Sequence, residues 1–203
     1  MTKFLLARKE CMTQLFDEQG VVRAGTILKT GPITITQVKT KEGKDGYAAI
    51  QVGFDAKKPE KTNKAQRTSK AFRVLKEYKV ENPADFSVGT AVALDAFIVG
   101  EEVRVVSTSK GKGFQGVVKR HGFHGGRRTH GQKHSEREPG SIGGGGRAGG
   151  RVAKGMRMAG RMGGERVTVK NLKVLHIDSK AGEIIISGAV PGARGSLVEV
   201  IAS

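Results

Sequence analysis

Four of the five histidines lie close together in the chain, where they could bind either a metal ion or a polyanion. They are His121, His124, His130 and His134. Imidazole is a common zinc ligand, but these histidines alternate with lysines and arginines that repel a dication, and no cysteine lies among them. Imidazole also stacks on bases and hydrogen-bonds to phosphates and 2′-hydroxyl groups. The pattern therefore favours contact with RNA, with a metal site as the alternative, and we expect no cofactor.

A glycine pattern just before the histidines could also bind phosphate groups. Residues 111–116 read GKGFQG, which matches G-x-G-x-x-G. A dinucleotide fold would need a helix after this motif, and Gly122 and Gly125 interrupt such a helix. With Val118 the pattern also fits a kinase loop, but the sequence has no H-R-D or D-F-G motif. We favour a backbone that lies against a phosphate chain over a nucleotide site.

Two acids in the same region, Glu136 and Glu138, are candidates for general acid/base chemistry. They flank Arg137 in a glycine-rich stretch without the apolar residues that would shift a carboxyl pKa. Ion pairs with neighbouring cations are the better interpretation. The sequence also lacks a nucleophile elbow and a Walker A motif. Nothing in these motifs calls for an enzyme.

All of these residues fall in one segment, 109–165, that is basic, rich in glycine and poor in core-forming residues. It holds 13 of the 36 Lys/Arg residues, 3 of the 19 acids and 18 of the 30 glycines. Such a stretch cannot bury enough apolar surface to offset its ordering entropy, so alone in water it should be mobile. Glycine permits close approach and the cations neutralise phosphates, so a nucleic acid is the expected partner.

The rest of the chain reads as short strands separated by turns. Alternating residues predict strands around Ile33 to Thr36 and Ile50 to Phe54. Further strands are expected at 91–99, 103–107, 167–170, 173–177, 183–187 and 196–201. This spacing predicts a mainly β protein with a compact barrel made of 1–108 and 166–203. Residues 109–165 then form an irregular arm anchored at both ends, and we use the name arm for them throughout.

Two stretches could either bind a partner or serve the barrel itself. The basic insertion 57–80 carries Phe72, Leu75 and Tyr78 at helical spacing, so we expect it to end in a short helix, with a solvated charged loop as the alternative. Met156, Met158 and Met162 alternate with arginines and glycines. They suit a surface that fits an irregular groove, or some of them pack the base of the arm against the barrel.

Composition limits the compartment and the partners. The net charge of +17 and a pI near 10.3 indicate nucleic acid or, less well, an anionic membrane surface. No run approaches the roughly 20 apolar residues that span a bilayer, and the amino-terminal apolar patch is too short for a signal peptide. Cys11 is the single cysteine, which excludes an intramolecular disulfide and fits a reducing cytosol.

Several long motifs together resemble one protein family. Residues 109–143 read SKGKGFQGVVKRHGFHGGRRTHGQKHSEREPGSIG. Three further motifs precede this run, RKECMTQLFDEQG, GPITITQVKT and DGYAAIQVGF, and two follow it, RMAGRMGGERVTVKNLKVL and GAVPGARGSLVEV. Taken in chain order, these motifs resemble the universal large-subunit ribosomal protein L-three family, of bacterial type. The resemblance covers nearly the whole chain.

The resemblance implies a structural component of the large ribosomal subunit in the cytoplasm and not an enzyme. It implies a translation-protein-type β-barrel, an arm that threads through ribosomal RNA toward the peptidyl-transferase centre, and a role in early subunit assembly. The implied partners are the 3′-terminal region of large-subunit rRNA and ribosomal proteins of the L-fourteen and L-nineteen families, with no membrane and no small-molecule substrate.

The resemblance and the charge pattern together give two sets of candidate residues. The expected RNA-binding residues are Lys110, Lys112, Lys119, Arg120, His121, His124, Arg127, Arg128, Thr129, His130, Lys133, His134, Arg137, Arg147, Arg151, Lys154, Arg157, Arg161 and Arg166. The expected tip near the peptidyl-transferase centre comprises Ser141, Gly143, Gly144, Gly145, Gly146 and Arg147.

Two other functions use the same features. An RNA-modifying enzyme or an RNA chaperone could use the arm as a substrate clamp, and stable association with large subunits through a high-salt wash would count against it. An architectural protein of duplex DNA would also need cations and glycines, but the sequence offers no helix that would read a groove. Binding to duplex DNA without preference for folded rRNA would favour that function.

Overall fold

The computed structural model describes residues 3–66, 72–144 and 149–202 of the chain. The chain divides into two units, one made of Met1–Thr108 and Arg166–Ser203 and the other of Ser109–Glu165. We call the first the larger unit; the second is the arm.

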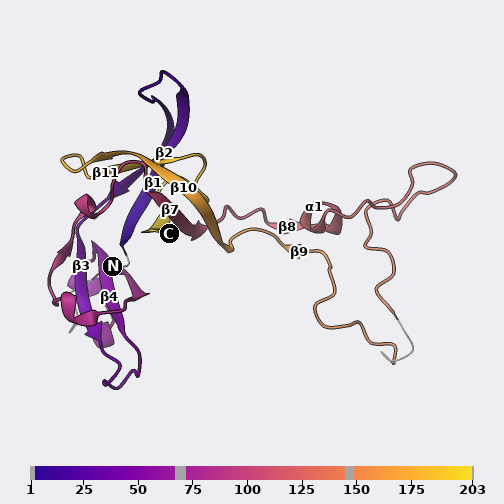
Figure 1. Cartoon of the computed structure of the whole chain (residues 1–203). Coiled ribbons are helices and arrows are strands. Elements are labelled where there is room, and N and C mark those ends of the chain that lie inside the picture. Colours follow the sequence, from indigo (N-terminus) through magenta and orange to yellow (C-terminus); the bar gives the residue numbers. More distant parts are fainter. Residues whose placement is uncertain (1–2, 67–71, 145–148, 203) are drawn as a thin grey trace. The chain divides into compact units, whose positions relative to one another are not determined.

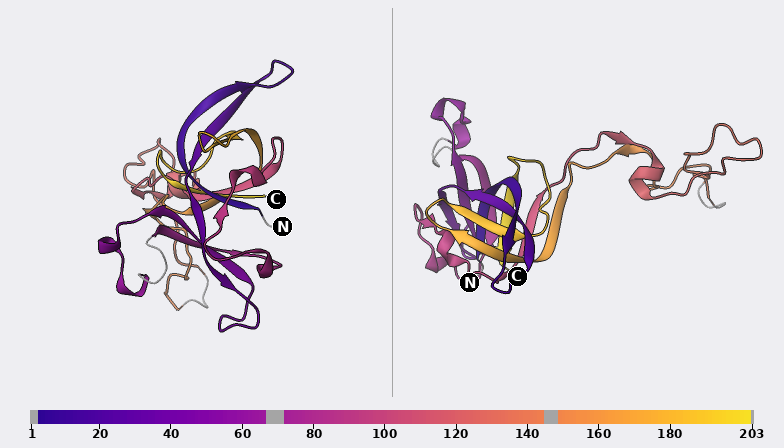
Figure 2. Two further views of the ribbon diagram at one scale, coloured as in Figure 1. Left: turned by 90° about the vertical axis from the view of Figure 1, so that its left-hand side faces the viewer. Right: turned by 90° about the horizontal axis from the view of Figure 1, so that it is seen from above.

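Six antiparallel strands of the larger unit pair in a ring, which Figure 2 shows from two sides. The order of pairing is β1-β12-β7-β10-β11-β2, and β2 returns to β1, so the barrel is closed. The strands are β1 (Phe4–Phe16), β2 (Val22–Thr30), β7 (Glu102–Thr108), β10 (Arg166–Asp178), β11 (Glu183–Ser187) and β12 (Leu197–Ala202). A closed ring leaves no strand edge open to pairing with other chains.

A second, four-stranded antiparallel sheet completes the larger unit (Figure 1). Its order is β5-β4-β3-β6, with β3 (Ile33–Lys39), β4 (Ala49–Ala56), β5 (Phe72–Lys79) and β6 (Ala91–Val92). Short 3-10 turns lie at Pro59–Lys61, Lys64–Gln66, Pro83–Asp85 and Leu94–Ala96. The charged segment between β3 and β4 and the basic segment between β4 and β5 both connect strands of this sheet.

One apolar core joins the ring and the sheet. Alternate residues of β4, such as Ile50, Val52 and Phe54, are buried in the same cluster as Leu5 and Leu6 of β1. The ring of Phe4 stacks on that of Tyr78 with centroids 4.3 Å apart. Because strand residues alternate between two faces, this period of two is what buries the β4 side chains.

The short helix that we predicted near Phe72, Leu75 and Tyr78 is wrong. Residues 72–79 form the edge strand β5, whose Tyr78 lies opposite Ile50 and whose Val74 lies opposite Phe54. The inward residues follow a period of two, and pairing with β4 outweighs the helical spacing of three apolar residues. The described part of the insertion contributes the two 3-10 turns, and residues 67–71 lie outside the described residues.

Other strand boundaries also differ from the prediction. The expected strand 91–99 is reduced to Ala91–Val92, followed by a 3-10 turn. The expected strands 167–170 and 173–177 are one strand, β10, with a register shift between Val169 and Leu172 at the left-handed residue Asn171. We did not predict β1 and β2. The prediction of a mainly β chain is confirmed, and β3, β4, β7, β11 and β12 lie close to where we expected them.

The arm has little regular structure. It contains β8 (Phe114–Gln115) paired with β9 (Gly160–Arg161), and the five-residue helix α1 (Val117–His121). Within the described ranges, Val117 is its one buried hydrophobic residue. No described helix of either unit is long and apolar enough to cross a bilayer.

Candidate nucleic-acid interface

The arm begins and ends as a two-stranded stem, residues 109–115 and 160–165. The Ser109 amide donates to the Glu165 carbonyl at 2.8 Å, and the Lys112 amide to the Met162 carbonyl at 2.9 Å. Gly163 has a φ of +76°, and a Cβ there would overlap the carbonyl oxygen of Lys110. Glycine is therefore required for the two chains of the stem to run this close together.

The helix α1 follows the stem directly and fixes two of the predicted residues. Gly122 ends the helix in a left-handed conformation, with its amide donating to the Val118 carbonyl at 3.0 Å. Arg120 Nη1 donates to the Met158 carbonyl oxygen at 2.7 Å, and His121 Nε2 lies 3.0 Å from the same oxygen. These two side chains are half-buried. They hold the outgoing chain, which follows the stem strand 109–115, to the returning chain, which leads into the stem strand 160–165.

A loop of residues 123–140 presents four cations, Arg127, Arg128, Lys133 and Arg137. The Gly126 amide donates to the Glu136 carbonyl at 2.9 Å, and a Cβ at Gly125 would overlap that same oxygen. Arg128 Nε lies 3.2 Å from Glu136 Oε2, which confirms the predicted ion pair for this acid. The loop thus closes on its own backbone, and its cations lie on the outside.

A hollow of about 560 Å³ lies within the arm beside this loop. Residues of α1, of the loop and of the returning chain line it, among them His121, His124, Gln132, Glu138 and Arg157. Four glycines also line it, and Phe123 and Pro139 add apolar surface beside the polar side chains. A flat base or a ribose could enter such a hollow, and the imidazole and guanidinium groups could donate hydrogen bonds to it.

Most of the predicted RNA-binding side chains are exposed. Sixteen have this status: Lys110, Lys112, Lys119, His124, Arg127, Arg128, Thr129, His130, Lys133, His134, Arg137, Arg151, Lys154, Arg157, Arg161 and Arg166. Ser141, Gly143 and Gly144 of the predicted tip are exposed as well, and Ser141 Oγ donates to the Gly143 carbonyl at 2.9 Å. Gly145, Gly146 and Arg147 lie outside the described residues.

The four histidines have different surroundings. His121 contacts the Met158 carbonyl and lies 5.9 Å from the Phe123 ring, His124 borders the hollow, and His130 occupies a left-handed position with a φ of +59°. In the described ranges, no three His, Cys, Asp or Glu side chains come close enough together to hold a metal ion. Their geometry offers hydrogen-bonding and stacking groups spread along the chain.

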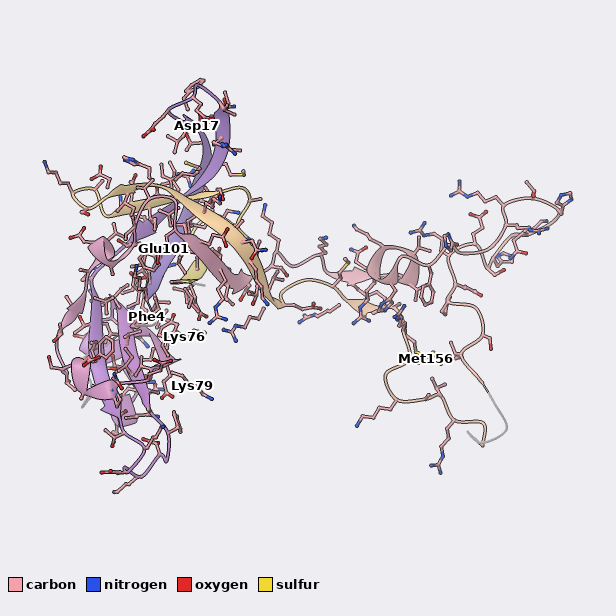
Figure 3. The ribbon with its side chains drawn as sticks, viewed as in Figure 1. Phe4, Asp17, Lys76, Lys79, Glu101 and Met156 are labelled. Carbon is pink, nitrogen blue, oxygen red and sulfur yellow. The ribbon has the colours of Figure 1, made fainter. Side chains whose placement is uncertain are left out.

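The methionines of the returning chain also differ in their exposure. Met158 and Met162 are half-buried, and their backbone carbonyls accept the hydrogen bonds of Arg120 and Lys112. Met156 is 40% exposed and lies on an irregular stretch of the arm (Figure 3). Met156 is thus exposed to a partner surface, and the backbones of Met158 and Met162 join the two sides of the arm.

Phe114 is a further candidate that the motif analysis did not single out. Its side chain is 73% exposed, and it pairs across the stem with Arg161. An exposed aromatic ring among cations is the usual platform for stacking a nucleic-acid base. The signal in the sequence was an aromatic residue inside a basic glycine motif.

Arg166 differs from the other candidates because it belongs to the larger unit. Its Nη2 lies 3.7 Å from Glu199 Oε2, and Lys76 Nζ lies 3.0 Å from Glu199 Oε1. Burial, followed by the Glu199 carboxylate, raises the pKa of the Tyr78 hydroxyl far above its usual range. That hydroxyl therefore stays protonated beside the carboxylate, and part of the Arg166 charge neutralises a buried acid.

Comparison with known proteins identifies the family. The family described as Ribosomal protein L3 matches residues 76–186. Proteins named large ribosomal subunit protein uL3 are 48% identical in Herpetosiphon aurantiacus and 47% identical in Pelotomaculum thermopropionicum, over 98% of this chain and 96% and 95% of theirs. A third, from Thermobifida fusca, is 45% identical over 98% of this chain and 94% of its own. The chain belongs to the ribosomal protein L3 family.

Membership of the ribosomal protein L3 family decides between the classes of function left open by the motifs. The chain is a ribosomal protein with a structural role in translation and is not an enzyme. Neither the glycine pattern at 111–116 nor the acids of the loop is a catalytic centre. The exposed cations of the arm are therefore candidates for a binding surface and not for catalysis.

Proposed function

We propose that the chain is a structural constituent of the large ribosomal subunit and that its arm binds large-subunit rRNA. The supporting observation is the charge of the arm, 13 Lys/Arg residues against 3 acids, with nearly all of its described cations exposed. In water such a charge density is unfavourable because like charges repel. Contact with RNA phosphates removes the repulsion and releases condensed counterions.

The proposed mechanism couples neutralisation to ordering. The larger unit docks on RNA, and the arm takes up a fixed shape as its cations replace counterions between converging phosphate backbones. Glycines let the backbone approach the phosphates, and the exposed ring of Phe114 offers a stacking surface for an unpaired base. Shape and backbone contacts dominate, so sequence-specific base contacts are a minor part of the binding energy.

The finer features follow the family resemblance and the names of the relatives, which describe large-subunit proteins. We propose a larger unit of the translation-protein type that binds near the 3′ end of the rRNA early in assembly, in the cytoplasm. Its neighbours are then proteins of the L-fourteen and L-nineteen families. The arm directs Ser141 to Arg147 toward the peptidyl-transferase centre.

A shortened arm tests this assignment. Replacing residues 140–154 with a short glycine linker removes the proposed tip and keeps the stem, α1 and residues 123–139 of the loop. We expect the shortened protein to bind large-subunit RNA and to enter particles, with chemical footprints altered only around the peptidyl-transferase centre. Complete loss of binding to the RNA site, or an unchanged footprint at that centre, would contradict the proposal.

A further inference from the structure

Two hollows on the larger unit lie side by side and share Asp55. The first, of about 300 Å³, is lined by residues of β1, β2 and the turn before β12, including Lys29 and Arg194. The second, of about 430 Å³, is lined by Asp55, Ala56, Lys57, Lys58, Lys61 and Arg73. Together they contain eight basic and two acidic residues, a concentration of charge outside the arm.

Two of these cations already have structural partners. Arg8 Nε donates to Asp55 Oδ2 at 2.8 Å, and Arg8 Nη1 donates to the Gly195 carbonyl at 2.7 Å. Lys9 Nζ donates to the carbonyls of Val190 and Gly192 at 2.6 and 3.1 Å. Arg8 thereby neutralises Asp55, the acid shared by both hollows, and joins β1 to β4.

The other cations of the two hollows form no ion pairs among the described residues. Lys29, Lys58, Lys61, Arg73 and Arg194 are exposed, Lys57 is half-exposed, and none has an ion-pair partner among the described residues. Other cations of the same unit are paired with acids, as Lys3 with Glu101 at 2.9 Å and Lys39 with Glu77 at 2.7 Å. Six unpaired cations around adjoining hollows repel one another, and an anionic ligand would relieve that repulsion.

The backbone at the centre of this group is held in an unfavourable conformation. Asp55 has a φ of +57°, in the left-handed region that residues with a Cβ rarely occupy. Such strain persists where the surrounding structure fixes it, and it is frequent at binding sites. The second hollow is also preformed, because buried Thr62 donates through Oγ1 to the Lys58 carbonyl at 3.2 Å and the Lys61 amide donates to it at 3.0 Å.

We propose that this cationic face, defined by Lys29, Lys57, Lys58, Lys61, Arg73 and Arg194, binds the sugar-phosphate backbone of RNA independently of the arm. The inference rests on the proposed function and locates where the larger unit docks. RNA fits better than an acidic protein because the one large apolar side chain of the hollows, Phe54, is 1% exposed. Protein interfaces usually centre on an exposed aromatic or aliphatic anchor, which this face lacks.

The test compares variants of the full chain in binding to an in vitro transcript of large-subunit rRNA over a range of salt concentrations. The test variant combines Lys29→Ala, Lys58→Ala, Lys61→Ala and Arg194→Ala. The matched control combines Lys41→Ala, Lys44→Ala, Lys173→Ala and Lys180→Ala, which removes the same charge at exposed positions outside both hollows. Thermal unfolding verifies that both variants fold.

We expect the test variant to bind at least tenfold more weakly and its salt slope to fall by about three, at roughly 0.7 to 0.9 per lost phosphate contact. In the control variant, both the RNA affinity and the salt slope should change much less. Equal losses in the two variants would overturn the proposed face. So would normal RNA binding by the test variant combined with its absence from assembled particles, because the face would then bind a protein.

A third variant separates this inference from the proposed function. It carries Arg127→Ala, Arg128→Ala, Lys133→Ala and Arg157→Ala in the arm and leaves the cationic face intact. If this variant loses binding and the test variant does not, the arm binds RNA and the inference about the face is wrong. If the unmodified chain binds duplex DNA as tightly as the transcript, the proposed function itself fails.

Discussion

The larger unit buries a continuous apolar cluster drawn from both of its sheets, whereas the described part of the arm buries one hydrophobic side chain, Val117. The larger unit also pairs several of its cations with its own acids, while the arm has 13 cations and 3 acids. Burial of apolar area can stabilise the first without a partner. The second lacks that source of stability, and we propose that contacts with a polyanion fix its shape.

The largest effect is expected on stability, and it tests whether the apolar core of the larger unit is independent of the arm. Phe54→Ala removes a side chain that is 1% exposed, and a change of this kind costs about 3–5 kcal/mol in the free energy of unfolding. Urea unfolding followed by circular dichroism should detect the loss. Val117→Ala is the control, and it should leave that transition unchanged. A large shift with Val117→Ala would mean that the arm contributes to the folding of the larger unit.

The second prediction concerns the tight loop of the arm. Gly125→Ala forces a Cβ against the Glu136 carbonyl at a φ of +76°, so the loop must open, and RNA affinity should fall by roughly tenfold. Gly131 has a similar φ of +83° and open space around it, so Gly131→Ala should cost much less. Filter binding to the rRNA transcript measures both. Equal affinities for the two variants would show that loop closure is unimportant.

A smaller effect is expected from a single exposed cation of the arm. Arg157→Ala removes one guanidinium from the border of the hollow, so affinity should fall roughly two- to tenfold and the salt slope by about 0.7 to 0.9. Lys180→Ala, in the exposed turn between β10 and β11, serves as the control. An unchanged salt slope for Arg157→Ala would mean that this residue contacts no phosphate.

The smallest effect concerns acid titration of the larger unit. A hydrogen bond from Lys39, with a second from Tyr47, lowers the pKa of the Glu77 carboxyl. Because the folded pKa lies below the unfolded value of about 4.3, the pair stabilises the fold above that pH, and the contribution is lost as the pH falls through the folded pKa. Thermal midpoints between pH 5 and pH 3 should therefore fall less steeply for Glu77→Gln than for the unmodified chain. Identical slopes would contradict the assignment.

Strands with a clear period of two could be predicted from the sequence. The expected strand at 183–187 has the bounds of β11, and Ile33, Ile35, Ile50 and Val52 alternate as β3 and β4 require. The edge strand β5 was misread because three apolar residues also fit a helix, and pairing with β4 decides the outcome. β1 was missed because Phe4–Ala7 form a continuous apolar run and the residues from Arg8 onward mix polar and apolar types without a period of two in the sequence.

The candidate residues of the arm could be chosen from charge alone, but the contacts and burial of each side chain could not be predicted. Arg120 and His121 contact the Met158 carbonyl, 37 or more positions away in sequence, because the returning chain passes beside α1. No local pattern encodes that path. The cationic face was missed for the same reason, since β2, the stretch after β4, β5 and the turn before β12 assemble it. Whether these side chains bind RNA stays a prediction.

The chain leaves the larger unit at Thr108 and re-enters it at Arg166, and these two residues are direct partners in the β7–β10 ladder. The 57 residues between them therefore form a closed loop whose ends are tied by neighbouring strands. A protease cut inside that loop should leave two fragments that co-purify under native conditions and separate only on denaturation. Loops of other lengths should be interchangeable there, because closure entropy grows slowly with length.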